Sequence, residues 1–204
     1  MDPDKLLLAL SDNQLISADE TAEVVEILNS ATNTSSNEVS IDEIYSFIVV
    51  ASRAKLTEAT SALEKLLELQ DPLTVSLILE TLCSEWQLVN DYLEIVCNFA
   101  LGVPWDYDED VRHTALKILG EYVRGKTSGK TNCAPLGVQA AQVLELLFSV
   151  FDEVGVETWT RRAAYCALLR AAGLEWEELP SESVAITFNE DSEKPISSLR
   201  LKVA

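Results

Sequence analysis

The segment from Gly125 to Thr131, GKTSGKT, holds the glycine, lysine and threonine residues from which phosphate-binding loops are built. A P-loop needs four residues between its two glycines, because that length lets the backbone amides wrap around the phosphates. Here only three residues separate Gly125 from Gly129, and the segment follows an amphipathic helix where a P-loop would follow a buried strand. We therefore interpret this segment as a flexible basic loop.

The other side chains that could do chemistry lack the partners that catalysis needs. His113 is the only histidine, so neither a His-based metal site nor a nucleophilic triad can be assembled around it. Acidic residues do occur in adjacent pairs, such as Asp152-Glu153. Adjacent side chains on a helix diverge, whereas a glycosidase needs two carboxylates that face one cleft. The sequence predicts no catalytic residue, no metal site and no cofactor.

The turn from Trp105 to Asp110, WDYDED, is the strongest candidate for a binding site. Tryptophan and tyrosine anchor many protein interfaces, and carboxylates can pair with lysine or arginine of a partner. The alternative is a packed turn, in which Trp105 covers a hairpin core and the acids favour the N-terminus of the next helix. The apolar stripe of that helix should leave further polar residues nearer the solvent. The predicted partner-binding residues are Trp105, Asp106, Tyr107, Asp108, Glu109, Asp110, His113, Lys117 and Glu121.

These residues belong to a succession of predicted helices, because apolar residues recur at helical spacing from residue 19 to residue 172. The chain has only 7 glycines and 6 prolines, too few for the many turns of a barrel or sandwich. Ser17 with Glu20 and Ser40 with Glu43 have the spacing of capping boxes, and Asp71-Pro72 is typical of a helix start. The predicted helices cover residues 19–30, 41–53, 57–69, 73–86, 88 to the turn at 103, 111–124, 136–151 and 158–172.

The short connections between these helices predict about four antiparallel hairpins. Stacked hairpins form an α-solenoid, whose usual role is to present a surface to another macromolecule. The predicted repeat domain covers residues 1–180. Beyond Pro180 the helical pattern ends, and residues 181–204 are predicted to form a tail or a small β-hairpin from segments 183–188 and 199–203.

The hairpin around the turn resembles the HEAT-repeat family. Asp108 to Arg112, followed by Ala115, Leu116, Leu119 and Gly120, is similar to that family's D-x-x-V-R-x-x-A-x-x-x-L-G signature. Asp71-Pro72 and the segment 158–169 match more weakly, so the resemblance covers about residues 55–173. It implies a right-handed α-solenoid but no single function, because HEAT-like proteins include scaffolds, DNA glycosylases and bilin lyases.

The net charge of −19 restricts the class of partner. Residues 1–52 alone hold ten acidic residues against one base, Lys5. Such a chain repels nucleic acid and anionic membranes, so the basic groove that a DNA glycosylase needs is missing. Basic proteins would be attracted instead. The other interpretation is that the acidity only keeps the protein soluble.

The cysteines and the N-terminus together predict a cytoplasmic protein. The four cysteines are scattered singly without a C-x-x-C pair, as expected of reduced thiols that pack as small apolar groups. The start of the chain, MDPDK, carries acid where a secretory signal carries base. The apolar run at residues 6–10 is too short to span a bilayer.

The sequence therefore predicts a non-catalytic protein-binding module. Its sharpest form is an acidic inhibitor or immunity-type protein that fills the cationic cleft of a basic protein, such as a toxin nuclease. The alternatives are a general HEAT-repeat scaffold or adaptor, and an enzyme accessory such as a bilin lyase subunit. The sequence identifies neither the partner nor the oligomeric state.

Overall fold

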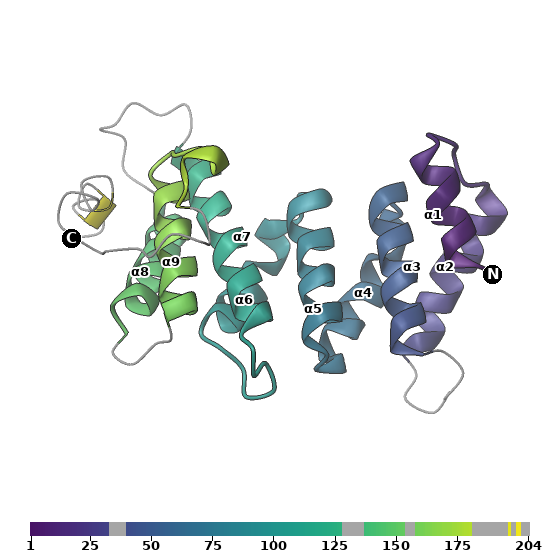
Figure 1. Cartoon of the computed structure of the whole chain (residues 1–204), viewed down its shortest axis with the longest axis horizontal. Helices are drawn as coiled ribbons and strands as arrows, with labels where there is room; N and C mark the ends of the chain where they lie inside the picture. Colours follow the sequence, from purple (N-terminus) through teal and green to yellow (C-terminus); the bar gives the residue numbers. More distant parts are fainter. Residues whose placement is uncertain (33–39, 128–136, 154–157, 181–195, 197–198, 201–204) are drawn as a thin grey trace. The chain divides into compact units, whose positions relative to one another are not determined.

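The computed structural model describes residues 1–32, 40–127, 137–153, 158–180, 196 and 199–200. Within these residues the secondary structure is helical and contains no strand, which confirms the prediction of an all-α protein (Figure 1). The elements are α1 (Pro3–Ser11), α2 (Ala18–Ala31), α3 (Ile41–Ala54), η1 (Thr57–Ala59), α4 (Thr60–Leu66), η2 (Leu67–Leu69), α5 (Pro72–Leu79), η3 (Glu80–Glu85), α6 (Val89–Ala100), α7 (Asp110–Thr127), α8 (Val138–Asp152), α9 (Thr158–Ala171) and η4 (Trp176–Glu178).

Local capping chemistry sets several of the helix starts. At α2 the Ser17 hydroxyl accepts from the Glu20 amide while the Glu20 carboxylate accepts from the Ser17 amide, and α3 repeats this arrangement with Ser40 and Glu43. The Asp71 carboxylate accepts from the Thr74 amide at 2.9 Å, with Pro72 at the first helical position of α5. The three start signals in the sequence are thus confirmed.

Two predicted helices are less regular than expected. Residues 57–69 form a short α-helix between two 3-10 turns, and the predicted helix 73–86 ends in a π-helical turn, η3. In η3 the amide of Trp86 donates to the carbonyl of Thr81, five residues earlier. This wider turn buries three consecutive side chains, Thr81, Leu82 and Cys83. The loop predicted from Gly125 also starts later, since α7 continues to Thr127, and the rest of that loop lies outside the described residues.

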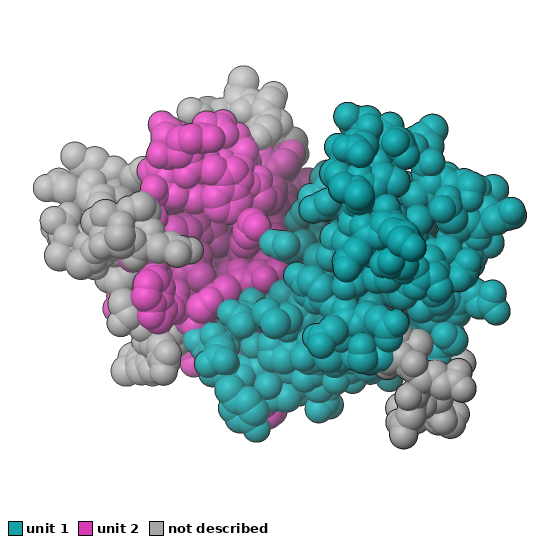
Figure 2. Space-filling view, turned by 45° about the vertical axis from the view of Figure 1, so that its right-hand side comes forward, with its two compact units in different colours: residues 1–92, 105–110 teal, residues 93–104, 111–204 magenta. Residues whose placement is uncertain are grey.

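By its contacts the chain divides into two compact units (Figure 2). Unit 1 comprises residues 1–92 and 105–110, and unit 2 comprises residues 93–104 and 111–204. In unit 1, α3 packs against α1, α2 and α5 around fully buried side chains such as Phe47 and Ile48. In unit 2, α8 packs against α9 with Leu144 and Leu168 buried, and the rings of Phe151 and Tyr165 stack 5.9 Å apart. The solenoid arrangement, the number of hairpins and the single domain over 1–180 remain predictions.

The acidity is concentrated in one of these units. Unit 1 contains 21 Asp and Glu residues against 4 Lys and Arg, a net charge of −17. Unit 2 contains 13 acidic and 11 basic residues, a net charge of −2. Long-range electrostatic attraction of a cation by this chain therefore originates in unit 1.

Three residues of the C-terminal tail are described, and they differ from the β-like pattern of the sequence. Ile196, Leu199 and Arg200 have helical backbone, and the two apolar side chains are buried. Arg200 donates to both carboxylate oxygens of Asp152, at 2.7 and 2.8 Å, and lies over the ring of Phe148. The remaining residues of the predicted hairpin lie outside the described part of the chain. In the described residues we find no helical stretch that could serve as a transmembrane span.

Candidate functional site

The turn between α6 and α7 presents one aromatic ring and two carboxylates to solvent. Tyr107 is 89% exposed, and Asp108 and Asp110 are exposed beside it. Trp105 is half-buried, and Asp106 is only 6% exposed. Trp105 and Asp106 therefore fit the packed turn, whereas Tyr107, Asp108 and Asp110 are accessible; an interface at this turn remains a prediction.

The backbone of the turn explains which side chains point outward. Glu109 has φ 59°, in the left-handed region that side-chain-bearing residues rarely adopt. Its amide donates to the carbonyl of Asp106 at 3.2 Å, so the chain reverses direction just before α7 begins. Asp106 was predicted to lie beside the solvent, but it is buried at this reversal. The surface that a partner can reach consists mainly of Tyr107, Asp108 and Asp110.

Three of the candidate residues on α7, those that follow Asp110, engage other parts of unit 2. His113 Nε2 lies 2.9 Å from Thr160 Oγ1 on α9, and Lys117 Nζ lies 5.7 Å from the ring centroid of Trp176. Glu121 pairs with Arg170, also on α9. The spacing of these three residues places them on one stripe of α7, as the sequence predicts. However, His113 and Glu121 are half-buried and only Lys117 is exposed. Their role in binding a partner remains a prediction.

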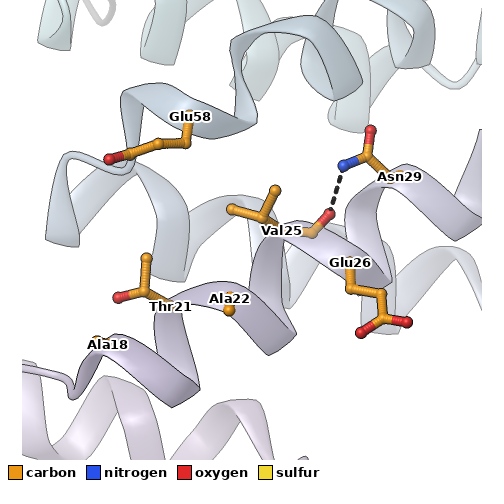
Figure 3. A pocket seen from close by; sticks show the side chains of 7 residues that line it. All are labelled: Ala18, Thr21, Ala22, Val25, Glu26, Asn29 and Glu58. Atoms are coloured by element: carbon orange, nitrogen blue, oxygen red, sulfur yellow. Dashed lines mark hydrogen bonds between the residues drawn. The ribbon is translucent and has the colours of Figure 1, made fainter.

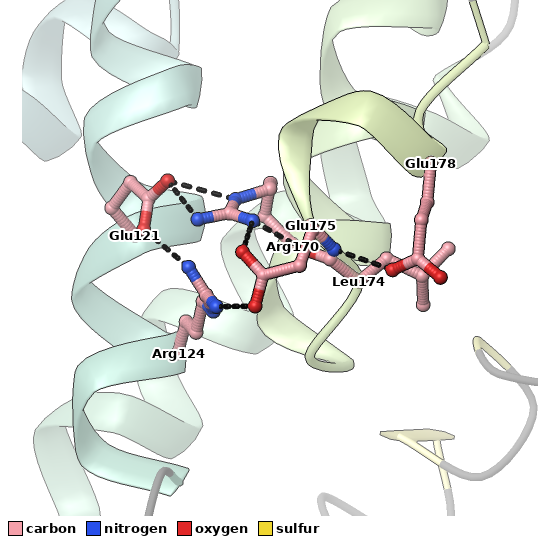
Figure 4. Close-up of polar contacts among 6 residues, drawn as sticks. All are labelled: Glu121, Arg124, Arg170, Leu174, Glu175 and Glu178. Atoms are coloured by element: carbon pink, nitrogen blue, oxygen red, sulfur yellow. Dashed lines mark hydrogen bonds and ion pairs between the residues drawn. The ribbon is translucent and has the colours of Figure 1, made fainter.

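A network of alternating charges joins α7 to the end of α9 (Figure 4). Arg170 is 2% exposed and pairs with Glu121 at 2.6 Å and with Glu175 at 3.4 Å. Arg124 pairs with the same two carboxylates. Arg170 also donates to the carbonyl of Leu174 and lies 4.7 Å from the ring centroid of Trp176. Two guanidinium groups thus face two carboxylates, an arrangement suited to holding the chain after α9 in place.

Sequence reasoning missed Arg170 as an important residue. An arginine near the end of a helix is usually an exposed residue that favours the helix C-terminus. The signal that was available is the apolar surrounding, ALLRAAGL, followed by the acids at 175, 177 and 178. A guanidinium inside such a segment needs carboxylate partners, and the structure supplies them in Glu121 and Glu175.

Arg112 is a second buried arginine with a structural role. Its side chain is 10% exposed, its Nε donates to the carbonyl of Ala100 at the end of α6, and its Nη2 lies 2.9 Å from Glu153. A Cβ atom on Gly102 would lie within 3.5 Å of this side chain, and Gly102 has φ 92°. Arg112 therefore links the end of α6 to Glu153, the residue that follows α8.

A groove on unit 1 lies along α2 and η1 (Figure 3). Its volume is about 480 Å³, and sequence reasoning did not anticipate it. The available signal was the spacing of small and apolar residues along one face of α2, next to the face that carries the buried Val24 and Leu28. The lining residues are Ala18, Thr21, Ala22, Val25, Glu26, Asn29 and Glu58.

The described cysteines are unsuited to nucleophilic catalysis. Cys83, Cys97 and Cys166 are free thiols. Burial raises the pKa of Cys83 to about 12. Burial also raises the pKa of Cys97 and of Cys166, the latter against the opposing effect of Arg162. A thiol must lose its proton before it can attack, so a raised pKa disfavours the reactive thiolate at neutral pH. Cys133 lies outside the described residues.

Comparison with models of known families, with curated proteins and with solved structures gave no match. The described residues contain no group of three or more His, Cys, Asp or Glu side chains placed to hold a metal ion. The described residues of the strongly acidic unit 1 present two accessible surfaces, an acidic turn and an apolar groove.

Proposed function

We propose that this chain is a helical-repeat protein-binding module whose unit 1 binds a basic protein. The observation that carries the proposal is the net charge of −17 on unit 1, against −2 on unit 2. An excess spread over the whole surface would only favour solubility, whereas an excess confined to one compact unit gives a field that selects and steers a cationic partner. The succession of antiparallel helices, including α2 with α3 and α8 with α9, supports a HEAT-type solenoid as the scaffold.

The turn before α7 supplies the first contact in this proposal. Tyr107 offers a large aromatic surface with few rotatable bonds, and such residues dominate the binding energy of many interfaces. Asp108 and Asp110 flank it and can accept hydrogen bonds from lysine or arginine. The aromatic ring provides affinity, and the carboxylates provide orientation and speed of association.

The role that fits these features best is inhibition of a protein with a cationic cleft. A nuclease toxin holds phosphates in such a cleft, and exposed carboxylates can take the positions of the phosphates. The inhibitor then needs no catalytic group. Its effectiveness depends on rapid association, which long-range attraction provides.

The proposal is tested by capturing the partner and measuring how fast it associates. The full chain is cross-linked in cell extract, bound proteins are identified by mass spectrometry, and the purified partner is studied at several salt concentrations. We expect a basic partner whose association rate falls steeply with salt, because the Debye length is only about 10 Å at 0.1 M. A neutral or acidic partner, or an association rate independent of salt, would overturn the proposal.

Matched charge reversals test whether the partner binds at unit 1, and at this turn in particular. The double variant Asp108→Lys with Asp110→Lys should slow association by about tenfold or more. The control, Glu145→Lys with Glu177→Lys, changes the net charge equally but at exposed positions of unit 2. Equal slowing in the two double variants would show that overall charge, and not the turn, determines the rate.

A further inference from the structure

We infer that the groove along α2 and η1 receives an amphipathic helix of the partner, with an apolar stripe between lysine or arginine side chains. The inference rests on the proposed function and names the part of the basic partner that unit 1 recognises. Its starting observation is an open, shallow and mainly apolar groove with a volume of about 480 Å³ in unit 1, the more acidic unit.

The floor of the groove is lined by small side chains, which would let a second helix come close. Ala18, Ala22 and Val25 follow one another at spacings of four and three residues, so they share one face of α2. Two alanines leave room for the backbone of a second helix to come close, and helices that pack lie only about 8–10 Å apart. Val25 and the methyl group of Thr21 provide apolar contact further along. Binding of a helix in an apolar groove is a recurring mode of peptide recognition.

The polar groups of the groove leave this apolar floor open. The side-chain amide of Asn29 donates to the carbonyl of Val25 at 2.9 Å, so its N–H group is satisfied by its own helix (Figure 3). The two acids, Glu26 on α2 and Glu58 on η1, come from different elements, and both are exposed. In Figure 3, Glu58 lies across the groove from Thr21 and Val25. A ligand in the groove therefore meets apolar contact along its floor and carboxylates at its sides.

The negative charge of unit 1 indicates which kind of ligand the groove can bind. A second copy of this chain would bring its own unit 1, with a net charge of −17, and the two would repel each other. An acidic or purely apolar helix would leave Glu26 and Glu58 without an opposite charge. A helix with lysine or arginine beside its apolar stripe can pack against the apolar floor and also pair with Glu26 and Glu58.

The test uses synthetic peptides and the full chain. A labelled amphipathic peptide of about 16 residues, long enough to form a helix when bound, carries a leucine and alanine stripe between lysines. One comparison peptide has the same composition in scrambled order, and another has glutamate in place of lysine. Fluorescence anisotropy should show that the first peptide binds at least about tenfold more tightly than either of the others.

Matched variants locate the binding surface. Ala22→Phe fills the groove, and Glu26→Lys with Glu58→Lys reverses its acids, so each should weaken binding at least about tenfold. The control, Glu64→Lys with Glu68→Lys, makes the same charge change at exposed positions of unit 1 that do not line the groove. It should weaken binding by less than about threefold. Circular dichroism checks that each variant is folded, and the charge-reversed pair tests the groove should Ala22→Phe not fold.

Each other outcome overturns the inference in a distinguishable way. If both double reversals weaken peptide binding equally and Ala22→Phe has no effect, the groove is not the binding site. The acidic unit 1 would then still be the binding surface of the proposed function. If the scrambled peptide binds as tightly as the amphipathic one, the ligand of the groove is not an amphipathic helix. A dimer of the chain alone in sedimentation, dissociated by Ala22→Phe, would identify a second copy as the occupant.

Discussion

The guanidinium group of Arg170 on α9 meets the carboxylate of Glu121 on α7 through one oxygen, Oε1, which accepts from Nε at 2.8 Å and from Nη2 at 2.6 Å. Arg170 is 2% exposed, whereas the side chain of Glu121 is 37% exposed. A buried cation is therefore held by a carboxylate that still reaches water. The pair links two helices of unit 2 and sets the position of the chain after α9.

Replacing Arg170 with Met should lower the free energy of unfolding by about 2 kcal/mol, because buried hydrogen bonds to a charged group are lost. The loss stays moderate, since Glu121 and Glu175 can be hydrated once the arginine is gone. The matched variant Arg124→Met removes a more exposed arginine of the same network and should cost about 0.5 kcal/mol. Urea denaturation measures both, and equal losses would contradict the importance of burial.

Gly120 of α7 lies close against the backbone of α9. A Cβ atom placed on it would lie 2.7 Å from the carbonyl oxygen of Ala167 and 2.8 Å from its Cα, distances that require the backbone to move. Gly120→Ala should therefore lower the free energy of unfolding by about 2 kcal/mol, although alanine is the better helix former.

Gly125 provides the control, because a Cβ atom there meets nothing within 4 Å. Gly125→Ala, in the same helix, should leave stability unchanged or raise it by up to about 1 kcal/mol. Thermal denaturation of both variants compares them directly. A stabilised Gly120→Ala protein would show that α7 and α9 do not pack through this residue.

Charge reversal should destabilise the fold at Asp106 but hardly change its stability at Asp108. Asp106→Lys places a long cation at a position that is 6% exposed and should cost about 3 kcal/mol of unfolding free energy. Asp108→Lys lies at an exposed position and should change stability by less than about 0.5 kcal/mol. Circular dichroism during urea denaturation separates the two, and similar stabilities would place Asp106 in solvent.

Cys83 should make the fold less stable in alkali. Its pKa in the folded protein is about 12, above its ordinary value of 9.0. Between these values the unfolded chain loses the thiol proton and the folded chain retains it. The unfolded state therefore binds fewer protons, and stability falls as pH rises. Cys83 should contribute a fall of about 1.4 kcal/mol per pH unit in this range.

The variant Cys83→Ala isolates this contribution. Burial also raises the pKa values of Tyr92 and Tyr122, but both proteins share those tyrosines. Urea denaturation under a reductant from pH 8 to 11 should therefore show a smaller fall for Cys83→Ala than for the parent chain. Parallel curves would show that the thiol is accessible to water.

The helices could be predicted where local signals agree. The capping boxes at Ser17 and Ser40 lie beside amphipathic stripes, and the predicted helices there begin and end within about two residues of α2 and α3. The sequence Asp2-Pro3 carries the same start signal as Asp71-Pro72, and Asp2 accepts from the Asp4 amide at 3.1 Å. The predicted helices nevertheless omit α1, because its continuous apolar run at residues 6–10 shows no helical periodicity.

The candidate binding surface was harder to predict, because it depends on contacts between distant residues. The stripe of His113, Lys117 and Glu121 follows from helical spacing, but only the folded chain reveals that residues of α9 and η4 meet this stripe. In the turn, no periodicity tells which acid points inward, so Asp106 and Asp108 look alike in sequence. The groove likewise depends on η1, whose Glu58 lies far from α2 along the chain.

The uneven division of charge also affects folding itself. With 17 charges of one sign uncompensated, unit 1 repels itself, and its unfolded chain can spread those charges further apart. Folding of unit 1 is therefore opposed by its own composition, and screening by salt relieves the opposition. If a cationic partner binds as proposed, it would do the same at specific positions, and complex formation and folding of unit 1 should reinforce each other. The proposed partner would thus neutralise the charge of unit 1 as salt ions do, but at fixed positions.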